Sequence, residues 1–370
     1  MMITANNGFI EQSERYAFDN AGESLKKYIL LQKGELAYNH GASKLRPFGS
    51  CFALTTAESA RIPFVYHCFS AENQNAEFLS IELNGSEVES QLRKIVSSGA
   101  RMDGLLNISF DEYSTVTVLL PDIKEQEHIA DFFRNLDHLI TLHQRKFDKL
   151  QVLKKAMLEK MFPKNGSSVP EIRFKGFTDA WEQRKLSEMC GTFEYGLNAA
   201  AKEFDGKNKY IRITDIDDAS REFLLSDLSS PDICLDGMSK YLLSSGDIVF
   251  ARTGASVGKT YIYRENDGIV YFAGFLIRAK VNQDNDAEFV FQSTLSPSYE
   301  KYIRITSQRS GQPGVNAQEY GEYDLFAPSK EEQQRIGHFL RGIDSLITLH
   351  QRELEKLQNI KKSMLEKMFV

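Results

Sequence analysis

Apolar residues recur at alternating intervals of four and three residues in two stretches of this chain, residues 129–162 and 336–369. This spacing places them along one side of an α-helix, so each stretch predicts a long amphipathic helix. The two stretches are copies of one another: an offset of about 207 residues holds without a gap from Pro121 to Phe162, with roughly 25 of 42 positions identical. We therefore predict an internal repeat in which each half ends in a helix.

The apolar side of such a helix needs a partner. An uninterrupted helix of this length would extend roughly 60 Å, more than the core of a small domain requires. Two helices of equal length can bury each other as a coiled coil, whereas two unrelated core helices would rarely sustain the heptad pattern. The predicted seam consists of Leu136, Ile140, His143, Phe147 and Leu150 on the first helix and Ile343, Ile347, His350, Leu354 and Leu357 on the second.

Short strand-like patterns separated by turn residues precede each helix. In the first half they predict strands at 27–31, 35–38, 51–54, 62–66 and 116–120 and a helix at 86–96. In the second half they predict strands at 210–213, 247–250, 275–278 and 323–326. Pro121 favours a helix start because proline lacks the N–H that a first turn leaves unpaired. Pro328 occupies the equivalent position before the second long helix.

A proline- and glycine-containing linker separates the two halves. The predicted division is a first domain at 1–120, a first long helix at 121–162, a linker at 163–170, a second domain at 171–327 and a second long helix at 328–370. Residues 28–38 faintly resemble residues 241–250, so the two domains are diverged copies. The opening from Arg173 to Trp181 has no counterpart in the first half, and we expect the first domain to be N-terminally incomplete.

Composition describes an ordinary water-soluble protein. Apolar residues make up 42% and charged residues 26%, and the net charge of −6 argues weakly against a nucleic-acid partner. The four cysteines lack the paired spacing of a zinc site or a disulfide framework. The start of the chain has no export segment, and no run of about 18 apolar residues occurs. We expect a cytoplasmic protein that does not insert into a membrane.

The segment 252–260 resembles a phosphate-binding loop, because glycines let backbone N–H groups surround a phosphate. Only three residues separate Gly254 from Gly258, however, where the nucleotide-hydrolysing motif needs four, so we do not expect nucleotide hydrolysis. The better interpretation is a turn that presents Arg252, Ser256 and Lys259 to an anionic surface. A turn with a purely structural role is the alternative.

Other catalytic patterns are missing. The chain has no base-methyltransferase pocket motif and no nuclease carboxylate pair at metal-binding spacing, and we expect neither catalysis nor a cofactor or metal. The loop at 307–316 instead carries side chains suited to base edges, since arginine can pair with guanine and glutamine or asparagine with adenine. It could equally be ordinary surface. With cations from the first domain, the remaining DNA-binding candidates are Lys44, Arg46, Arg101, Gln308, Arg309, Gln312 and Asn316.

These features together resemble the specificity subunits of type I restriction-modification systems. The resemblance rests on the opening at 173–186 with Trp181, on Gly246, Asp247 and the following Arg252-Thr253-Gly254, on residues 274–278, on Pro328 with its following Glu-Gln pair, and on the paired helices. It implies an α+β fold in which two mixed α/β target-recognition domains are separated by two long antiparallel helices that form a coiled coil.

The family also implies a function. Each target-recognition domain would read one half of a bipartite target in double-stranded DNA, the helices would fix the spacing, and the subunit would be non-catalytic. Its partners would be modification subunits, which methylate adenine, and a restriction subunit, which translocates and cleaves DNA. The shortened first domain departs from the family pattern, and we expect it to bind DNA weakly or not at all. The alternative is a non-reading interaction protein that binds modification subunits through its helices.

Overall fold

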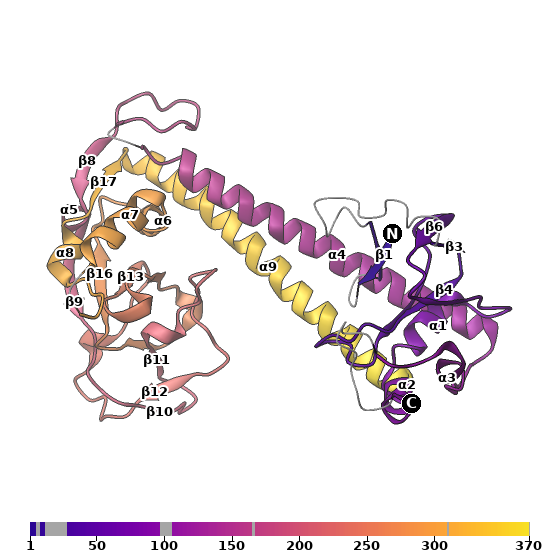
Figure 1. Cartoon of the computed structure of the whole chain (residues 1–370). Coiled ribbons are helices and arrows are strands. Elements are labelled where there is room, and N and C mark those ends of the chain that lie inside the picture. The colour runs from indigo at the N-terminus through magenta and orange to yellow at the C-terminus, as the bar shows by residue number, and fades with distance from the viewer. Residues whose placement is uncertain (5–7, 12–27, 97–105, 165–166, 309–310, 370) are drawn as a thin grey trace. The chain divides into compact units, whose positions relative to one another are not determined.

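The computed structural model describes residues 1–4, 8–11, 28–96, 106–164, 167–308 and 311–369. They form two compact units (Figure 1): unit 1 comprises residues 1–143 and 353–370, and unit 2 comprises residues 144–352. The two longest helices, α4 (Ile123–Lys160) and α9 (Lys330–Met368), each contribute one end to each unit. Both units mix helices with strands, which confirms the predicted α+β class.

Unit 2 is built on a four-stranded antiparallel sheet. Its order is β14 (Thr260–Ile262), β13 (Asp247–Ala251), β16 (Leu276–Val281) and β9 (Cys190–Tyr195). All five residues of β13 are buried, as expected for a central strand with neighbours on both sides. The remaining strands pair as β8 (Glu182–Lys185) with β17 (Asp324–Ala327), β10 (Ala201–Glu203) with β12 (Ser229–Pro231), and β11 (Lys209–Ile211) with β15 (Val270–Phe272).

Short helices complete unit 2. They are α5 (Leu186–Met189), α6 (Ala287–Ser293), α7 (Pro297–Thr306) and α8 (Ala317–Gly321), with 3-10 turns η3 (Ile213–Asp215), η4 (Ser239–Tyr241), η5 (Gly254–Ser256) and η6 (Glu265–Asp267). Every residue of α6 after Ala287 is buried. Phe289 of α6 packs on Phe162, at the end of the first repeat copy, with ring centroids 5.4 Å apart, and on Trp181 at 5.8 Å. Leu340 of α9 belongs to the same core and is fully buried.

Unit 1 has smaller sheets. Its three-stranded sheet has the order β5 (Ser50–Ala53), β4 (Leu36–Asn39) and β7 (His67–Phe69), and its two-stranded sheets are β3 (Ile29–Gln32) with β6 (Ser59–Ile62) and β1 (Met2–Thr4) with β2 (Gly8–Ile10). Its short helices are α1 (Ala76–Glu82), α2 (Ser86–Ile95) and α3 (Phe110–Tyr113). The helix predicted at 86–96 is therefore confirmed.

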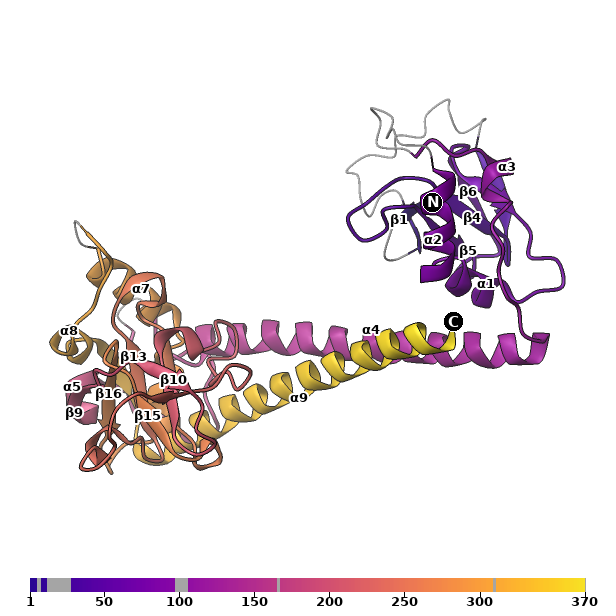
Figure 2. The same ribbon diagram turned by 90° about the horizontal axis from the view of Figure 1, so that it is seen from below.

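Within each unit the segments of α4 and α9 pack antiparallel. In unit 1, Lys361 of α9 pairs with Asp137 of α4 at 2.5 Å, and Phe369, the residue after α9, packs against the earlier Phe133 of α4, with ring centroids 6.0 Å apart. In unit 2, Lys154 of α4 forms an ion pair with Asp344 of α9, and both helices leave this unit on the same side (Figures 1 and 2). None of the ten predicted seam residues is fully exposed: Leu136, Ile343, Ile347 and Leu354 are buried, and Ile140, His143, Phe147, Leu150, His350 and Leu357 are half-buried.

The repeat extends from the long helices into the packing of both units. The side chain of Gln333 accepts from the backbone N–H of Asp286, which caps α6, and donates to the carbonyl of Pro328, at 3.0 and 2.9 Å. Gln126 in unit 1 does the same with Asn75, the cap of α1, and with Pro121, at the same two distances. Each long helix is thus joined near its start to the cap of a short helix.

We expect Gln333→Ala to destabilise unit 2 by about 1–2 kcal/mol. Gln333 is buried, and its removal leaves a partly buried N–H and a partly buried carbonyl without their partner. Trp181 is the only tryptophan of the chain and lies in the core of unit 2, so its fluorescence during denaturant unfolding reports on this unit. Gln334→Ala, at the exposed neighbouring position, is the control and should leave the unfolding midpoint unchanged.

Two predicted strands are wrong. The prediction at 62–66 falls on a turn between β6 and β7, because Pro63 cannot continue the hydrogen-bond ladder. Residues 116–120 align in the repeat with β17, which pairs with β8; the described residues of unit 1 provide no strand for them. The backbone of Thr117 is instead bonded on both sides by the Gln91 side chain, at 2.9 and 2.8 Å.

No helix within the described ranges is long and apolar enough to span a membrane.

Candidate nucleic-acid interface

Two loops of unit 2 that the sequence singled out separately form one surface. Arg252 follows the central strand β13; its backbone N–H donates to Phe275 at 3.1 Å and its carbonyl accepts from Val315 at 2.9 Å. Gly254 then donates to the carbonyl of Pro313 at 3.0 Å, with φ of 70°, a conformation that glycine adopts without strain. The loop after β13 and the described residues of the 307–316 loop are therefore held against each other by the backbone.

Aromatic side chains flank Arg252 on this surface. Its guanidinium carbon lies 4.9 Å from the ring centroid of Tyr195, a cation–π distance. Tyr195 is 45% exposed and Phe275 is 60% exposed, which is unusual for rings next to a central sheet. Together they border a cavity of about 560 Å³ that also includes Asn198 and Thr214. A cation beside exposed rings is suited to nucleic acid, since the rings offer stacking and the guanidinium a fork of donors.

The same cavity contains a second, restrained arginine. Arg212 donates from Nε and Nη2 to the two carboxylate oxygens of Asp215, at 2.8 and 2.9 Å. This hydrogen bonding raises the pKa of Arg212. The cavity wall also depends on Gly196, because a Cβ there would lie 2.1 Å from the carbonyl oxygen of Ala273. Arg252 has no such carboxylate partner among the described residues, which leaves its guanidinium the freer of the two.

The other candidates of unit 2 divide into exposed and engaged side chains. Gln308 and Gln312 are exposed, and Gln312 lies beside Gly254. Asn316 caps α8 and accepts from the N–H of Glu319 at 2.9 Å, so its side-chain oxygen is already used. Lys259 is ion-paired with Asp218 and faces a different cavity, and the carbonyl of Ser256 accepts from the Lys259 N–H at 3.0 Å. Arg309 lies outside the described residues.

The candidates of unit 1 do not gather in the same way. Lys44 is exposed, whereas Arg46 is half-buried and donates from Nη1 to the carbonyl of Asn84 at 2.7 Å. Burial lowers the pKa of Arg46. Arg101 lies outside the described part of the chain.

The position equivalent to Arg252 in unit 1 is His40. The repeat aligns the strands β4 and β13, and the carbonyl of His40 accepts from Leu106 at 2.8 Å, as that of Arg252 accepts from Val315. The His40 ring is buried, however, and lies against His67 with centroids 5.0 Å apart. Unit 1 therefore places a buried ring where unit 2 presents a half-exposed guanidinium.

Sequence reasoning missed Tyr195, Phe275 and Arg212. Phe275 was predicted as part of a strand, and its exposure follows from its place in the turn before β16. A sequence sign was available in the Tyr195-Gly196 and Gly274-Phe275 pairs, because a glycine beside an aromatic residue allows close backbone approach. In the described ranges no group of three or more His, Cys, Asp or Glu residues is arranged to hold a metal ion.

Comparison with known proteins identifies the family. Residues 178–359 match the family model of the type I restriction modification DNA specificity domain. The type I restriction enzyme MjaVIII specificity subunit of Methanocaldococcus jannaschii is 24% identical over 299 residues, which cover 78% of this chain and 67% of that protein.

One solved structure has a similar fold, and a second is more distant. The crystal structure of the type I restriction-modification S subunit from M. genitalium matches 93% of this chain and 85% of its own, with 15% identity and a TM-score of 0.55. That of the HsdS subunit from Thermoanaerobacter tengcongensis matches 92% and 81%, with 16% identity and a TM-score of 0.45.

The matched segment, and with it most of unit 2, is a DNA specificity domain. Residues 178–359 belong to the family of type I restriction-modification specificity domains, and the chain is similar to a specificity subunit over most of its length, as its motifs predicted. Members of this family are DNA-recognition components of these systems and are not their catalytic subunits.

Proposed function

We propose that this chain selects the DNA sequence on which a type I restriction-modification complex acts, and that unit 2 reads one half of a bipartite target. The observation that carries the proposal is the surface formed by Arg252, Gln312 and the exposed rings of Tyr195 and Phe275. It combines a half-exposed cation, an amide and stacking surfaces on a rigid backbone. These are the groups that base edges and phosphates require.

The repeat supports a second reader of related architecture in unit 1. Both units use the same glutamine contact between the long helix and a short helix. We propose that residues 1–120 and 171–327 are the two target-recognition domains, that residues 163–170 link the halves, and that the helices at 121–162 and 328–370 set the distance between the half-sites. Because His40 is buried where unit 2 has Arg252, unit 1 should contribute less to binding.

The partners proposed are modification subunits and a restriction subunit. Exposed apolar residues on the long helices offer contact surface for them: Leu139 and Leu142 in unit 1, and Val152, Leu153, Phe339, Leu346 and Leu349 in unit 2. Because the proposed ligand is double-stranded DNA inside the cell, we place the protein in the cytoplasm.

Methylation of a random-sequence DNA library tests the proposal. The chain would be purified with a modification subunit, and the methylated molecules would be sequenced. We expect enrichment of a defined motif, with the stronger half assigned to unit 2 by its loss in Arg252→Ala. Methylation without any sequence preference would contradict the proposal and would favour a non-reading interaction protein that only binds modification subunits.

A further inference from the structure

A second and larger cavity lies in unit 2 on the other side of the loop after β13. Its volume is about 710 Å³. The walls come from the loops at 218–221 and 255–259, from α7, and from the segments of α4 and α9 at 151–158 and 344–351. This size falls within the range of small-molecule sites, which is about 300–1,000 Å³.

Cations outnumber carboxylates around this cavity. The cationic residues are Lys154, Lys155, Arg221, Lys259 and Arg304, and the acidic residues are Asp218, Glu300 and Asp344. Two carboxylates are already neutralised, because Lys154 pairs with Asp344 and Lys259 with Asp218. Within the described structure Lys155, Arg221 and Arg304 have no ion-pair partner, and only Glu300 remains to balance them.

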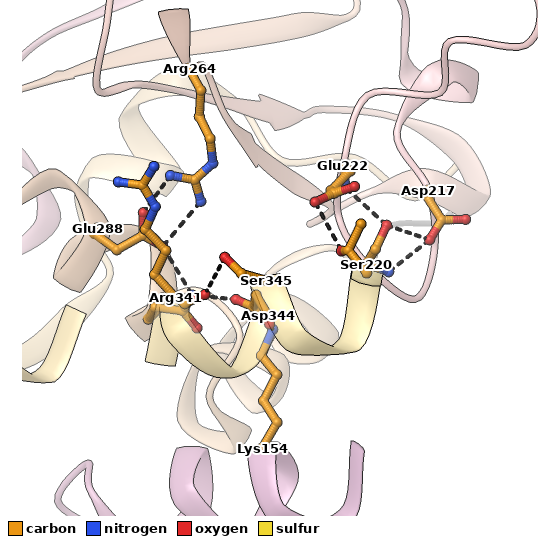
Figure 3. A network of polar contacts seen from close by, with 11 residues as sticks. Lys154, Asp217, Ser220, Glu222, Arg264, Glu288, Arg341, Asp344 and Ser345 are labelled. Carbon is orange, nitrogen blue, oxygen red and sulfur yellow. Dashed lines mark hydrogen bonds and ion pairs between the residues drawn. The ribbon is translucent and has the colours of Figure 1, made fainter. Parts of the chain in front are cut away.

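Asp344 also supports the wall of the cavity. It accepts from Gln292 at 2.8 Å, and Figure 3 shows it between Lys154 and the Arg264–Glu288 pair. Because its carboxylate serves both α4 and α6, it is not free to neutralise a further cation. The excess of positive charge around the cavity therefore follows from the contacts that the fold gives to Asp344.

Arg221 is the most informative of the three free cations. Its Nη1 atom is buried and has no hydrogen-bond partner within the described structure, which is costly for a charged donor. Its φ of 60° is strained for any residue other than glycine.

The surrounding loop holds this conformation in place. Asp217 accepts from both the N–H and the hydroxyl of Ser220, at 2.7 and 2.8 Å, and the Ser220 hydroxyl accepts from the N–H of Glu222 at 3.2 Å (Figure 3). The loop thus fixes the Arg221 guanidinium in the wall of the cavity, where an anion would offset the cost of its positive charge.

We propose that this cavity binds a phosphate group, with Arg221, Lys155 and Arg304 as its cationic ligands. A guanidinium can donate to two phosphate oxygens at once, and the hydroxyl of Ser307 in the wall can donate to another. The phosphate belongs either to a free mononucleotide or to the DNA backbone. Binding of a free mononucleotide would be independent of the proposed DNA-reading function, whereas binding of the DNA backbone rests on that function. Lys259 joins this wall to the loop of Arg252, so occupancy should influence the DNA-binding surface.

Thermal unfolding with inorganic phosphate and with AMP tests the free ligand. For the full chain we expect the Trp181 unfolding midpoint to rise by roughly 3–6 °C at about ten times the dissociation constant. In Arg221→Gly the midpoint without ligand should equal or exceed that of the original chain, because glycine adopts the positive φ freely, and the ligand-dependent rise should vanish. Lys280→Ala removes an exposed cation outside the cavity and should preserve the rise.

Salt dependence of DNA binding tests the other source. Neither small anion need raise the midpoint if the cavity binds a phosphate of the DNA backbone. In that case we expect Arg221→Gly to lower the slope of log affinity against log salt by about one. A ligand-dependent rise that persists in Arg221→Gly would overturn the proposal, as would the absence of both effects. If the chain does not read DNA at all, the thermal unfolding experiment with phosphate and AMP still tests the cavity by itself.

Discussion

Replacing Glu332 by alanine is expected to destabilise unit 2 by about 3 kcal/mol. Glu332 lies in the first turn of α9 and accepts from Nε and Nη2 of Arg173, each at 2.7 Å. The Glu332 side chain is 1% exposed and that of Arg173 is 13% exposed. Removing the carboxylate leaves a mostly buried guanidinium without its partner, and the small hydrated fraction of Arg173 keeps the cost at the lower end of the range for buried pairs.

The chain provides matched controls for this experiment. Glu331 is exposed on the preceding position, and Glu125 is the repeat equivalent of Glu332 in unit 1, where it is exposed and has no arginine partner among the described residues. Alanine at either position should change stability by less than about 0.5 kcal/mol.

A double-mutant cycle isolates the ion pair. Arg173→Ala with Glu332→Ala should be less destabilising than the sum of the single changes, because no unpaired charge remains. The midpoint and slope of the denaturant transition, followed by Trp181 fluorescence, give the free energies. Strictly additive single changes, or a Glu332→Ala protein as stable as the original, would contradict this account.

The long helices were predictable because their signal is both strong and repeated. A heptad pattern of this length leaves few alternatives, and the second copy confirms the register of the first. The ungapped offset also predicts equivalent contacts, and Gln126 and Gln333 make them in the two units. Central strands such as β13 were predictable for a related reason, since a strand buried on both faces is a continuous apolar run.

The candidate site was predictable only in part. Arg252 and Gln312 were identified because glycine-rich loops that carry polar residues are recognisable from local sequence. The engagement of Lys259 by Asp218 could not be predicted, because the two residues are far apart in the chain and meet only in the fold. Asn316 is a different case: the spacing of Asn316 and Glu319 is a helix-capping pattern, so its structural role could have been recognised.

The difference between Arg252 and His40 required the structure. The faint similarity of the two domains aligns their strands, but it does not tell whether the residue after each strand faces solvent or a neighbouring ring. His40 is buried beside His67, which comes from the adjacent strand β7. Burial of a loop residue depends on such non-local neighbours, and a local pattern contains no information about them.

Arg252→Ala is expected to weaken binding of the selected DNA target by roughly 5- to 150-fold, equivalent to about 1–3 kcal/mol. The guanidinium is half-exposed beside Tyr195 and has no carboxylate partner in the described part of unit 2. Its backbone is fixed on both sides by Phe275 and Val315, so the side chain extends from a rigid support. Little backbone freedom then remains to be lost when DNA binds.

The pattern of the loss distinguishes two roles for Arg252. If it reads a guanine, Arg252→Ala should relax the sequence preference at one base pair, and Arg252→Lys should not restore it because lysine lacks the planar fork. If it contacts a phosphate, affinity should fall evenly across sequences, the salt slope should decrease by about one, and lysine should restore much of the binding.

Titration of the selected duplex at several salt concentrations, with Lys280→Ala as the control for loss of an exposed cation, separates these outcomes. The Trp181 transition establishes that each variant is folded. A folded Arg252→Ala protein with unchanged affinity, preference and salt slope would remove this surface from the DNA interface. Loss of binding in Lys280→Ala as well would mean that overall charge, and not the position of Arg252, determines affinity.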